Sequence, residues 1–397
     1  MRGAGGAGTA GPVGPGGGGA NLLALRSHNA ALVLDLLRAA GDEGISRLEL
    51  AERTGLTPQA VSKITARLRE DGLAAEAGRR ASTGGKPRTV LRLVPEAGHA
   101  VGVHLDRDEV RAVLVDLRGT VVGERRAALT LGAGAEAVLG AVRETVTGVL
   151  AAAGTDAVPR LGAAGGGGDS PPGPTRLGPA LLGVGVALPG PLDHARGVLH
   201  RVTGFPEWDG FPLREALAER LGVPVVVDKD TNAAALGLAA GGEGGSFAYL
   251  HLGTGLGAGL VIGGSLHRGA RTGAGEFGHQ VLQLDGPPCT CGNRGCVEAL
   301  CLGAVARGDL REAARVLGAG AANLVGLLDI DVVLLGGRTV AAAPEAFTDG
   351  VGTVLAAWAR RTGQDAVPVR VAAGGGGAVA AGAAELVLGP VFGRGGG

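Results

Sequence analysis

Apolar residues recur at two different spacings along the chain, and the change between them falls near residue 95. Before it, Leu32, Leu36 and Leu37, and later Val61 and Leu68, follow the spacing of helices that are apolar on one face. After it, short runs rich in Val and Leu alternate with helical segments, which favours an α/β architecture. We therefore expect two folded parts, residues 21–95 and residues 96–397.

The second part is predicted to contain short apolar strands and a long helix that precedes an insert. Residues 154–179, rich in Gly and Pro, are expected to be this disordered insert, and residues 1–20, mostly Gly, a disordered tail. The expected strands are 101–105, 110–116, 120–127, 182–188, 223–227, 248–252, 257–262 and 332–335, and the helix covers 135–153.

Residues typical of helix ends divide the first part into a helix–turn–helix. Ser46 followed by Glu49 has the pattern of a capping box, in which each side chain bonds the other residue's backbone N–H. Gly55 can adopt the left-handed conformation that ends a helix, and Thr57 before Pro58 begins the next one. Two strands, 73–78 and 89–94, flank a basic loop. This part is therefore predicted to be an α+β winged helix-turn-helix domain.

One face of the second helix is polar and basic, and such a face suits DNA. Gln and Ser hydrogen-bond base edges, while Lys and Arg contact phosphates. The loop at 82–88 is the predicted wing, and Lys86→Ala is expected to weaken binding to all sequences alike. A small helical domain without affinity for DNA is the alternative interpretation. The candidate DNA-binding residues are Thr57, Gln59, Ser62, Lys63, Arg67, Lys86 and Arg88.

Composition and charge narrow the class of protein. The 78 glycines follow no three-residue period, which argues against a collagen-like fibre. The chain has 37 basic and 37 acidic residues, yet residues 21–95 hold twelve Lys and Arg against eight Asp and Glu. It has no uninterrupted apolar run of about 18 residues and no secretory leader pattern. We expect a cytoplasmic protein that does not interact with membranes.

All four cysteines are close together in the sequence, and three of them follow a histidine. The pattern His279-x9-Cys289-x-Cys291-x4-Cys296 supplies one imidazole and three thiolates, a set that suits tetrahedral Zn²⁺. Since four protein ligands leave no coordination position open, the zinc of loop 279–296 is expected to be structural, one ion per chain. Cys301 is expected to be a packing residue. The alternative is four unrelated residues in a chain kept reduced.

Three segments that follow strands carry groups suited to a sugar or a phosphate. Gly253-Thr254-Gly255 permits close backbone approach to a phosphate. Asp230 and Asn232 follow another strand, at the end where open α/β sheets bind ligands. Glu276 stands near His279, and an Asp beside a sugar hydroxyl could act as a general base. For Asp230 or Glu298, a helix cap or a solvated charge is the alternative.

From Asn21 to the carboxyl end, the chain resembles the transcriptional regulators of the ROK family (repressor, open reading frame, kinase). The first motif is the winged helix ending in Ser82-Thr83-Gly84-Gly85-Lys86-Pro87. The second and third are residues 183–193, GVGVALPGPLD, and residues 230–236, DTNAAAL. The fourth and most specific is Gly275-Glu276-Phe277-Gly278-His279 running into the cysteine cluster and Glu298.

This resemblance implies an actin-like (ribonuclease H-like) two-lobed α/β domain, with a sugar in the cleft between the lobes. It also implies that the zinc loop supports the sugar-contacting residues, that Asp230 is the equivalent of the kinase base, and that the protein is a dimer or tetramer. The implied sugar-binding residues are Asp230, Glu276, His279 and Glu298.

Departures from the family pattern concern the phosphate loop. Family kinases have Asp-x-Gly-Gly-Thr-Lys where this chain has His-Leu-Asp-Arg-Asp-Glu at 104–109. Two like charges about 4 Å apart repel by roughly 1 kcal/mol in water and roughly 4 kcal/mol at an effective dielectric of 20. Three carboxylates, of which Arg107 is expected to offset at most one, therefore predict no ATP binding and no catalytic residue. Gly253, Thr254 and Gly255 would be a remnant of a phosphate loop.

Two further departures concern the sugar. Lys229 replaces the family's Asn before Asp230, and Gly204 replaces an Asn before Trp208. The identity of the sugar, and whether any sugar binds, therefore stay open.

Together these patterns predict a sugar-responsive, DNA-binding transcriptional regulator, a repressor, that binds a double-stranded operator as a homo-oligomer. Its effector would be a small sugar or sugar phosphate. One alternative is an active ATP-dependent, glucokinase-like sugar kinase with a DNA-binding appendage. Another is a regulator whose cleft binds no ligand.

Overall fold

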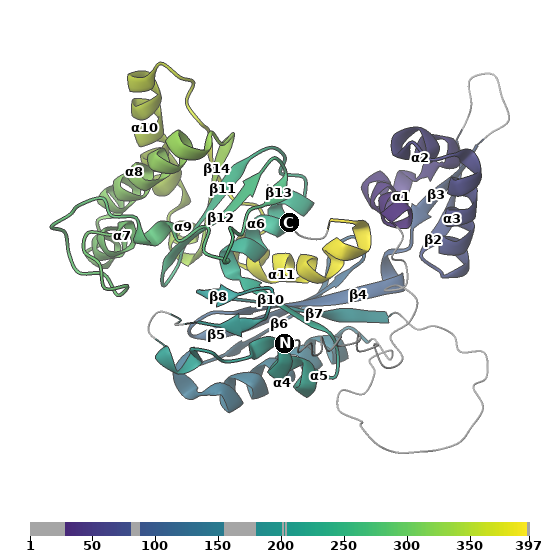
Figure 1. Ribbon diagram of the computed structural model, residues 1–397, viewed down its shortest axis with the longest axis horizontal. Helices are drawn as coiled ribbons and strands as arrows, with labels where there is room; N and C mark the ends of the chain where they lie inside the picture. Colours follow the sequence, from purple (N-terminus) through teal and green to yellow (C-terminus); the bar gives the residue numbers. More distant parts are fainter. Residues whose placement is uncertain (1–27, 81–87, 155–179, 201, 203–204, 395–397) are drawn as a thin grey trace, which may run out of the picture.

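A small helix-rich module lies beside two α/β lobes, and one helix, α11, lies between the lobes (Figure 1). The computed structural model describes residues 28–80, 88–154, 180–200, 202 and 205–394. The predicted tail 1–20, nearly all of the insert 154–179, the loop with Lys86, and Gly204 lie outside the described residues.

The module has the predicted helix–turn–helix. Ser46 and Glu49 form the capping box, with the Glu49 carboxylate accepting the Ser46 N–H at 2.8 Å. Gly55 ends the helix with φ 70°, and the Thr57 hydroxyl accepts the Ala60 N–H at the start of the next. The elements are α1 (His28–Ala40), β1 (Ile45–Ser46), α2 (Arg47–Thr54), α3 (Pro58–Glu70), β2 (Ala74–Arg80) and β3 (Arg88–Leu93), with sheet order β1-β3-β2.

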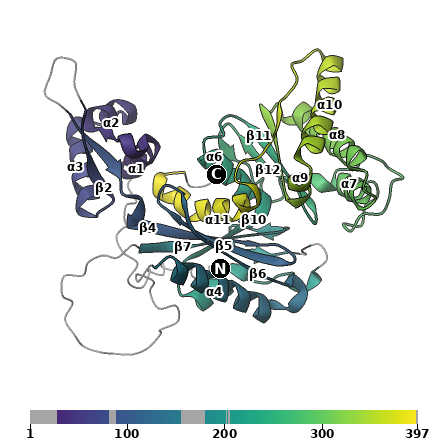
Figure 2. The ribbon, with the colours of Figure 1, turned by 180° about the vertical axis from the view of Figure 1, so that it is seen from behind.

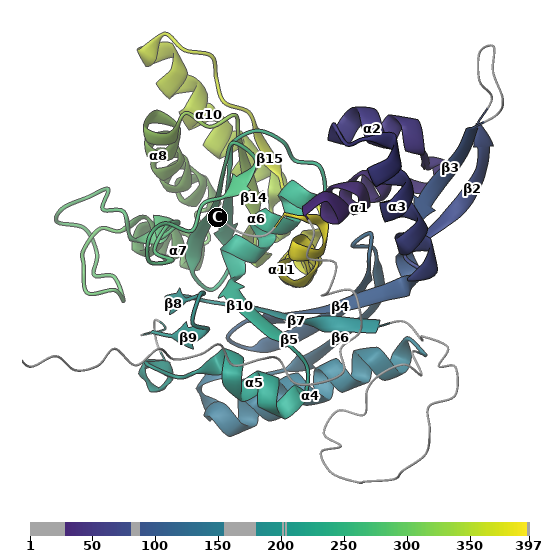
Figure 3. The same ribbon diagram turned by 45° about the vertical axis from the view of Figure 1, so that its right-hand side comes forward.

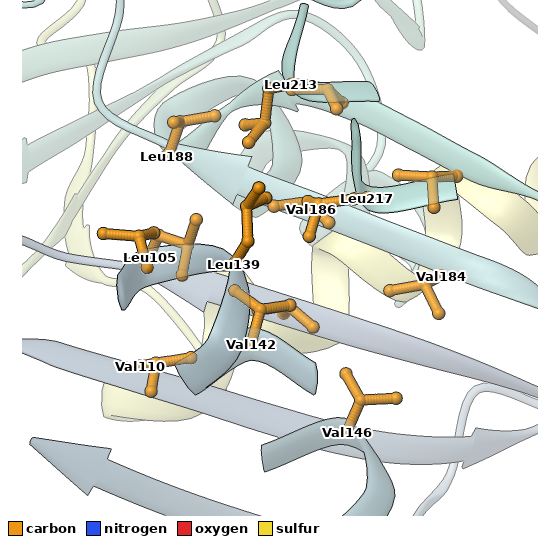
Figure 4. Close-up of a cluster of buried hydrophobic side chains, with 14 of the residues drawn as sticks. Leu105, Val110, Leu139, Val142, Val146, Val184, Val186, Leu188, Leu213 and Leu217 are labelled. Atoms are coloured by element: carbon orange, nitrogen blue, oxygen red, sulfur yellow. The ribbon is translucent and has the colours of Figure 1, made fainter. Parts of the chain in front are cut away.

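Lobe 1 is a five-stranded sheet of order β10-β7-β4-β5-β6, whose faces are both covered. Alternate residues of β4, such as Val101 and Val103, enter the core under α4 and α5, whereas Ala100 packs on the α11 side. Figure 4 shows the first of these cores, with Val142 and Val146 of α4 over the sheet. The elements are β4 (Gly98–Leu105), β5 (Glu109–Asp116), β6 (Val121–Ala128), α4 (Ala135–Ala152), β7 (Ala180–Leu188), β8 (Leu192–Asp193), β9 (Val198–Leu199), α5 (Leu213–Leu221) and β10 (Val225–Lys229).

Lobe 2 repeats this arrangement with the order β13-β12-β11-β14-β15. In both lobes three antiparallel strands continue into two parallel strands, the last of which lies at the edge. The elements are β11 (Phe247–Leu252), β12 (Leu256–Ile262), β13 (Ser265–Leu266), α7 (Val297–Ala306), α8 (Leu310–Leu328), β14 (Val332–Gly336), α9 (Arg338–Ala342), α10 (Pro344–Thr362) and β15 (Val369–Val371).

Two helices connect the lobes: α6 (Asp230–Ala240) and α11 (Ala378–Leu388). Seen from behind, α11 lies between the lobe 1 sheet and lobe 2, with one end toward the module (Figure 2). Two sheets with the same strand order, joined by crossing helices, define the actin-like two-lobed domain that the sequence predicts.

One strand extends beyond its predicted end. The strand expected at 223–227 runs over Val225–Lys229, because Pro224 has no N–H to donate and Asp228 and Lys229 are buried with polar partners. Lys229 is therefore a strand residue, and α6 begins at Asp230.

Among the described residues, Gly375–Phe392 is one helical segment long and apolar enough to cross a membrane, and 56% of it is buried inside the protein. In this fold that segment contains α11, which packs on β4, β7 and α6.

Candidate ligand cleft, metal centre and nucleic-acid interface

The residues implied to bind a sugar line one cavity of about 90 Å³ between the lobes. Asp230 comes from the start of α6, Glu276 precedes the short helix Phe277–His279, and Glu298 lies in the first turn of α7. Gly255 and Thr254 of the glycine turn line the same cavity. The fold thus brings together Asp230, Glu276, His279 and Glu298, together with the predicted phosphate-loop remnant.

Glu298 joins the glycine turn to the helix that follows the cysteines. Its carboxylate accepts the backbone N–H of Leu256 at 2.8 Å, at the start of β12. One Glu298 oxygen is therefore occupied by the turn, and the carboxylate is held at the cavity wall.

Lys229 is buried in the floor of this cavity, with 3% of its side chain exposed. Its ammonium donates to the Ala274 carbonyl at 2.5 Å and to Glu276 Oε1 at 3.1 Å. Its aliphatic part lies against Gly190, where a Cβ would come within 2.8 Å of Lys229 Cδ. Since β10 belongs to lobe 1 and Glu276 to lobe 2, this ion pair joins the lobes.

Asn232 does not reach the cavity. It is fully buried, and its amide nitrogen donates to Asp228 Oδ1 at 2.8 Å. Asp228 also accepts from Arg268 at 2.7 Å. The expectation that Asn232 stands with Asp230 at a ligand site is therefore wrong, because helical spacing turns Asn232 back toward the strand end.

At the other end of the cleft, carboxylates of residues 104–109, which belong to lobe 1, form ion pairs with an arginine of lobe 2. Arg338, the first residue of α9, donates to Asp106 at 2.5 Å and to Asp108 at 2.8 and 3.0 Å. Glu109 pairs with Arg111 at 3.4 Å. The guanidinium of Arg107 lies 5.4 Å from the centre of the Phe205 ring.

Arg338 therefore supplies a positive charge opposite Asp106 and Asp108, a contact that was not predicted from the sequence. Burial disfavours the charged form of Asp106, but the Arg107 N–H and the Arg338 guanidinium outweigh it and lower its pKa. The hydrogen bond from Arg338 lowers the pKa of Asp108. Both carboxylates are charged at neutral pH, and the ion pairs span the gap between the lobes.

Behind these ion pairs lies a second cavity of about 360 Å³. His104 and His251 line it, and Tyr249 donates to or accepts from His251 Nδ1 at 2.9 Å. Burial lowers the pKa of His104, although the nearby Asp230 carboxylate opposes this shift. His104 is therefore neutral at pH 7.

The four predicted metal ligands converge. Their ligand atoms all lie within 4.8 Å of one another, with Cys289 Sγ 3.7 Å from His279 Nδ1 and Cys291 Sγ 3.7 Å from Cys296 Sγ. With Zn–S bonds of about 2.3 Å, two thiolates of a tetrahedron lie about 3.8 Å apart. His279, Cys289, Cys291 and Cys296 thus have the spacing and the chemistry of a site for zinc.

Cys301 takes no part in this cluster. It is buried in α7, and its thiol donates to the Ala313 carbonyl of α8 at 3.5 Å. Burial raises the pKa of Cys301 to about 12, and the nearby Glu298 carboxylate adds to the shift. Its surroundings agree with the predicted packing role.

The predicted recognition face is exposed on α3. Val61, Thr65 and Leu68 are buried against the module, while Gln59, Ser62, Lys63 and Arg67 face solvent, as does Thr57 before them. Arg88, the first residue of β3, is exposed. Figure 1 shows α3 at the edge of the module away from α11, and Figure 3 shows β2 and β3 at the outer edge of the module.

Three residues of importance escaped sequence reasoning: Arg338, Arg38 and Glu385. Arg338 has a local signal, since it follows Gly336-Gly337 at the end of a predicted strand. Arg38 and Glu385 have none, because they lie 347 positions apart in the chain.

The architecture and the site together define a class: a two-lobed actin-like protein with an attached winged helix-turn-helix. Residues 175–310 match the ROK family, and residues 32–74 match the winged helix-turn-helix DNA-binding family. The sequence is 31% identical to that of the ROK hexokinase from Thermus thermophilus, over 72% of this chain and 96% of that chain. The crystal structure of that hexokinase superposes on this structure with a TM-score of 0.56. The chain therefore belongs to the ROK family.

The chain is also similar to regulators of transcription. A ROK family transcriptional regulator, described as a homolog of the E. coli MLC protein, shares the fold with a TM-score of 0.70, at 19% identity over 92% of this chain and 97% of that chain. The xylose repressor of Caldicellulosiruptor bescii is 28% identical over 70% of this chain, and the transcriptional dual regulator NagC of Escherichia coli 31% identical over 70%. The chain spans 64% of the length of each of these two regulators.

Proposed function

We propose that this protein is a sugar-responsive, DNA-binding transcriptional regulator, a repressor, without kinase activity. The observation that carries the proposal is the combination in one chain of an exposed polar-basic recognition helix and an interlobe cleft lined by Asp230, Glu276, His279 and Glu298. The similarity to a xylose repressor and to NagC supports it.

The DNA-binding surface consists of the start and exposed face of α3 together with the wing. Gln59 and Ser62 read base edges, and the cations contact phosphates, which makes the affinity salt-dependent. A homodimer or tetramer presents paired recognition helices to a near-palindromic operator. The residues in this role are Thr57, Gln59, Ser62, Lys63, Arg67, Lys86 and Arg88.

The effector is a small sugar or sugar phosphate at the carboxylate end of the cleft. Carboxylates that accept hydrogen bonds from hydroxyls favour such a ligand. The names of the relatives make D-xylose and N-acetylglucosamine the first compounds to test. The ligand acts through its differential affinity for two lobe arrangements.

A structural zinc ion, one per chain, is held by His279, Cys289, Cys291 and Cys296. Since His279 also lines the cleft, the ion would fix one wall of the effector site. A reduced cysteine cluster and a DNA partner fit the cytoplasm.

The absence of kinase activity rests on residues 104–109. In place of the kinase loop, Asp106 and Asp108 are paired with Arg338 across the gap. The kinase alternative is favoured by one observation, the retention of Asp230 in the same cavity as Thr254 and Gly255 of the glycine turn.

Two experiments test the proposal. Selection from a random pool of duplexes should enrich a near-palindromic sequence, and thermal-shift screening should find a stabilising sugar among D-xylose, D-glucose, N-acetylglucosamine and their phosphates. A ligand at 100 times its Kd stabilises by about 2.7 kcal/mol. Failure to enrich any duplex would refute the regulator. ATP-dependent phosphorylation of any of these sugars that Asp230→Asn abolishes would establish the kinase.

A further inference from the structure

The helix α11 reaches from the cleft to the DNA-binding module. At its amino end, Gly375, Gly376 and Val379 line the 360 Å³ cavity together with Asp106 and Arg338. At its carboxyl end, Glu385 contacts Arg38 of α1. Val379 and Glu385 are six residues apart, which is about 9 Å along a helix axis.

The contact between Glu385 and Arg38 is a buried, two-pronged ion pair. Arg38 Nη1 and Nη2 donate to the two Glu385 oxygens at 3.1 and 2.5 Å, and each side chain is 8% exposed. Arg38 Nε and Nη2 also donate to the Arg118 carbonyl of lobe 1, at 3.1 and 2.8 Å. The guanidinium stacks 4.7 Å above the Phe392 ring. A planar guanidinium fits such an arrangement, and a lysine does not.

Apolar packing continues from this contact to the recognition helix. Leu388 and Phe392 share one core with Leu34 and Leu37 of α1 and with Leu68 of α3. The interior of a protein is close-packed, so that a shift of one element displaces its neighbours. α11 and α3 thus contribute side chains to one continuous packed core.

Contacts along α11 are made backbone to backbone. A Cβ on Gly102 of β4 would overlap the Ala380 carbonyl oxygen, and a Cβ on Gly382 would overlap the Ala233 carbonyl oxygen of α6. Beside them, a cavity of about 250 Å³ lies among Arg38, Glu385, α6 and the start of α11. The helix is thus tightly held by both neighbours, and the cavity leaves free volume beside Glu385 and Arg38.

We propose that α11 transmits the state of the cleft to the DNA-binding module, and that Glu385 and Arg38 are the positioning residues through which it acts. The inference rests on the proposed function, since it names how occupancy of the cleft alters DNA binding. It requires that a change at the Arg338 end of the cleft reach α1 only while the ion pair is intact.

The test changes the contacts between the lobes by a substitution, so that no effector has to be known. Arg338→Ala removes the ion pairs with Asp106 and Asp108 and leaves the Lys229–Glu276 pair in place. It is combined with Glu385→Gln, which keeps the shape of the side chain but removes its charge. The matched control is Glu243→Gln, because Glu243 lines the same 250 Å³ cavity but pairs with Arg370. The readouts are affinity for a duplex selected with the wild-type chain and hydrogen exchange of the α1 amides.

We expect Arg338→Ala to change the duplex affinity at least five-fold in the wild-type and Glu243→Gln chains, and less than two-fold in the Glu385→Gln chain. The rate of hydrogen exchange of the α1 amides should rise with Arg338→Ala in the wild-type and Glu243→Gln chains, but not in the Glu385→Gln chain. Equal effects in all three chains, or none in the wild type, would overturn the inference.

Two further outcomes are possible, and each has its own experiment. If Glu385→Gln does not fold, Arg38→Lys replaces it, with the same expected and overturning results. If the wild-type chain enriches no duplex, the proposed function fails, while the exchange of the α1 amides still decides whether the cleft and α1 are coupled.

Discussion

The ammonium of Lys229 lies 3.1 Å from a carboxylate oxygen of Glu276, so that an ion pair joins the two lobes in the cavity that Asp230 and Glu298 also line. Family kinases have an asparagine at this position. Lys229 has donors only, and it occupies a carboxylate oxygen of Glu276 that, in the proposed site, would accept from a sugar hydroxyl.

Lys229→Asn should therefore raise the affinity for neutral sugars. Freeing Glu276 restores a hydrogen bond to a charged group, which contributes about 1.5–3 kcal/mol, or about a ten-fold gain or more. Isothermal titration calorimetry with D-glucose and D-xylose measures it. Lys229→Met, which frees Glu276 without supplying an amide, should gain less. Unchanged affinity in both variants would show that the pair does not compete with sugar.

Lys63→Ala should weaken DNA binding alike on specific and random duplexes and should reduce the salt dependence. Loss of one phosphate contact lowers the slope of log affinity against log salt by about 0.9. Titrations between 50 and 200 mM salt, roughly the range where such slopes are measured, give both quantities. Arg360→Ala on α10 of lobe 2, also exposed, is the control and should change neither. If the slope of log affinity against log salt in Lys63→Ala equals that of the wild-type chain, Lys63 does not contact a phosphate.

Elemental analysis should find one zinc per chain, and Cys289→Ser should lose it and lower Tm, since the loop then lacks the bond that orders it. Cys301→Ala is the control: it removes a thiol from the same region but should retain the metal, because Cys301 bonds only the Ala313 carbonyl among the described residues. A fully folded wild-type chain without metal contradicts the site.

Stability should fall as the pH drops below about 6.5. Burial lowers the pKa of His104 in the folded chain, so between that pKa and about 6.5 the unfolded chain binds the proton and the folded chain does not. Burial lowers the pKa of His99 and His194 as well. The lowered pKa values of Asp106 and Asp108 act only at more acidic pH, below about 4.

His104→Asn should accordingly flatten the dependence of unfolding free energy on pH between 5 and 7, measured by urea denaturation, without abolishing it. The control is His267→Asn, at an exposed histidine, which should keep the wild-type curve. A wild-type curve in His104→Asn would mean that folding leaves the pKa of His104 unchanged.

Much of the fold was predictable from short-range patterns. The helix ends at Ser46, Gly55 and Thr57 and the alternating apolar strands follow from interactions within a few residues. The cysteine cluster was predictable for the same reason, because its ligands lie in one loop. The roles of Asp230, Glu276 and Glu298 in binding a sugar stay predictions, although the fold brings their side chains to one cavity.

The sequence by itself determined the helix ends, the strand periodicity, the candidate metal ligand set and the exposed basic face of α3, since each depends on neighbours along the chain. Only the tertiary structure decided that Arg338 neutralises Asp106 and Asp108, that Lys229 pairs with Glu276, and that Glu385 holds Arg38. The physical reason is distance: each of these pairs joins separate lobes or domains, and an ion pair forms between charges only where packing of the intervening cores places them within a few ångströms.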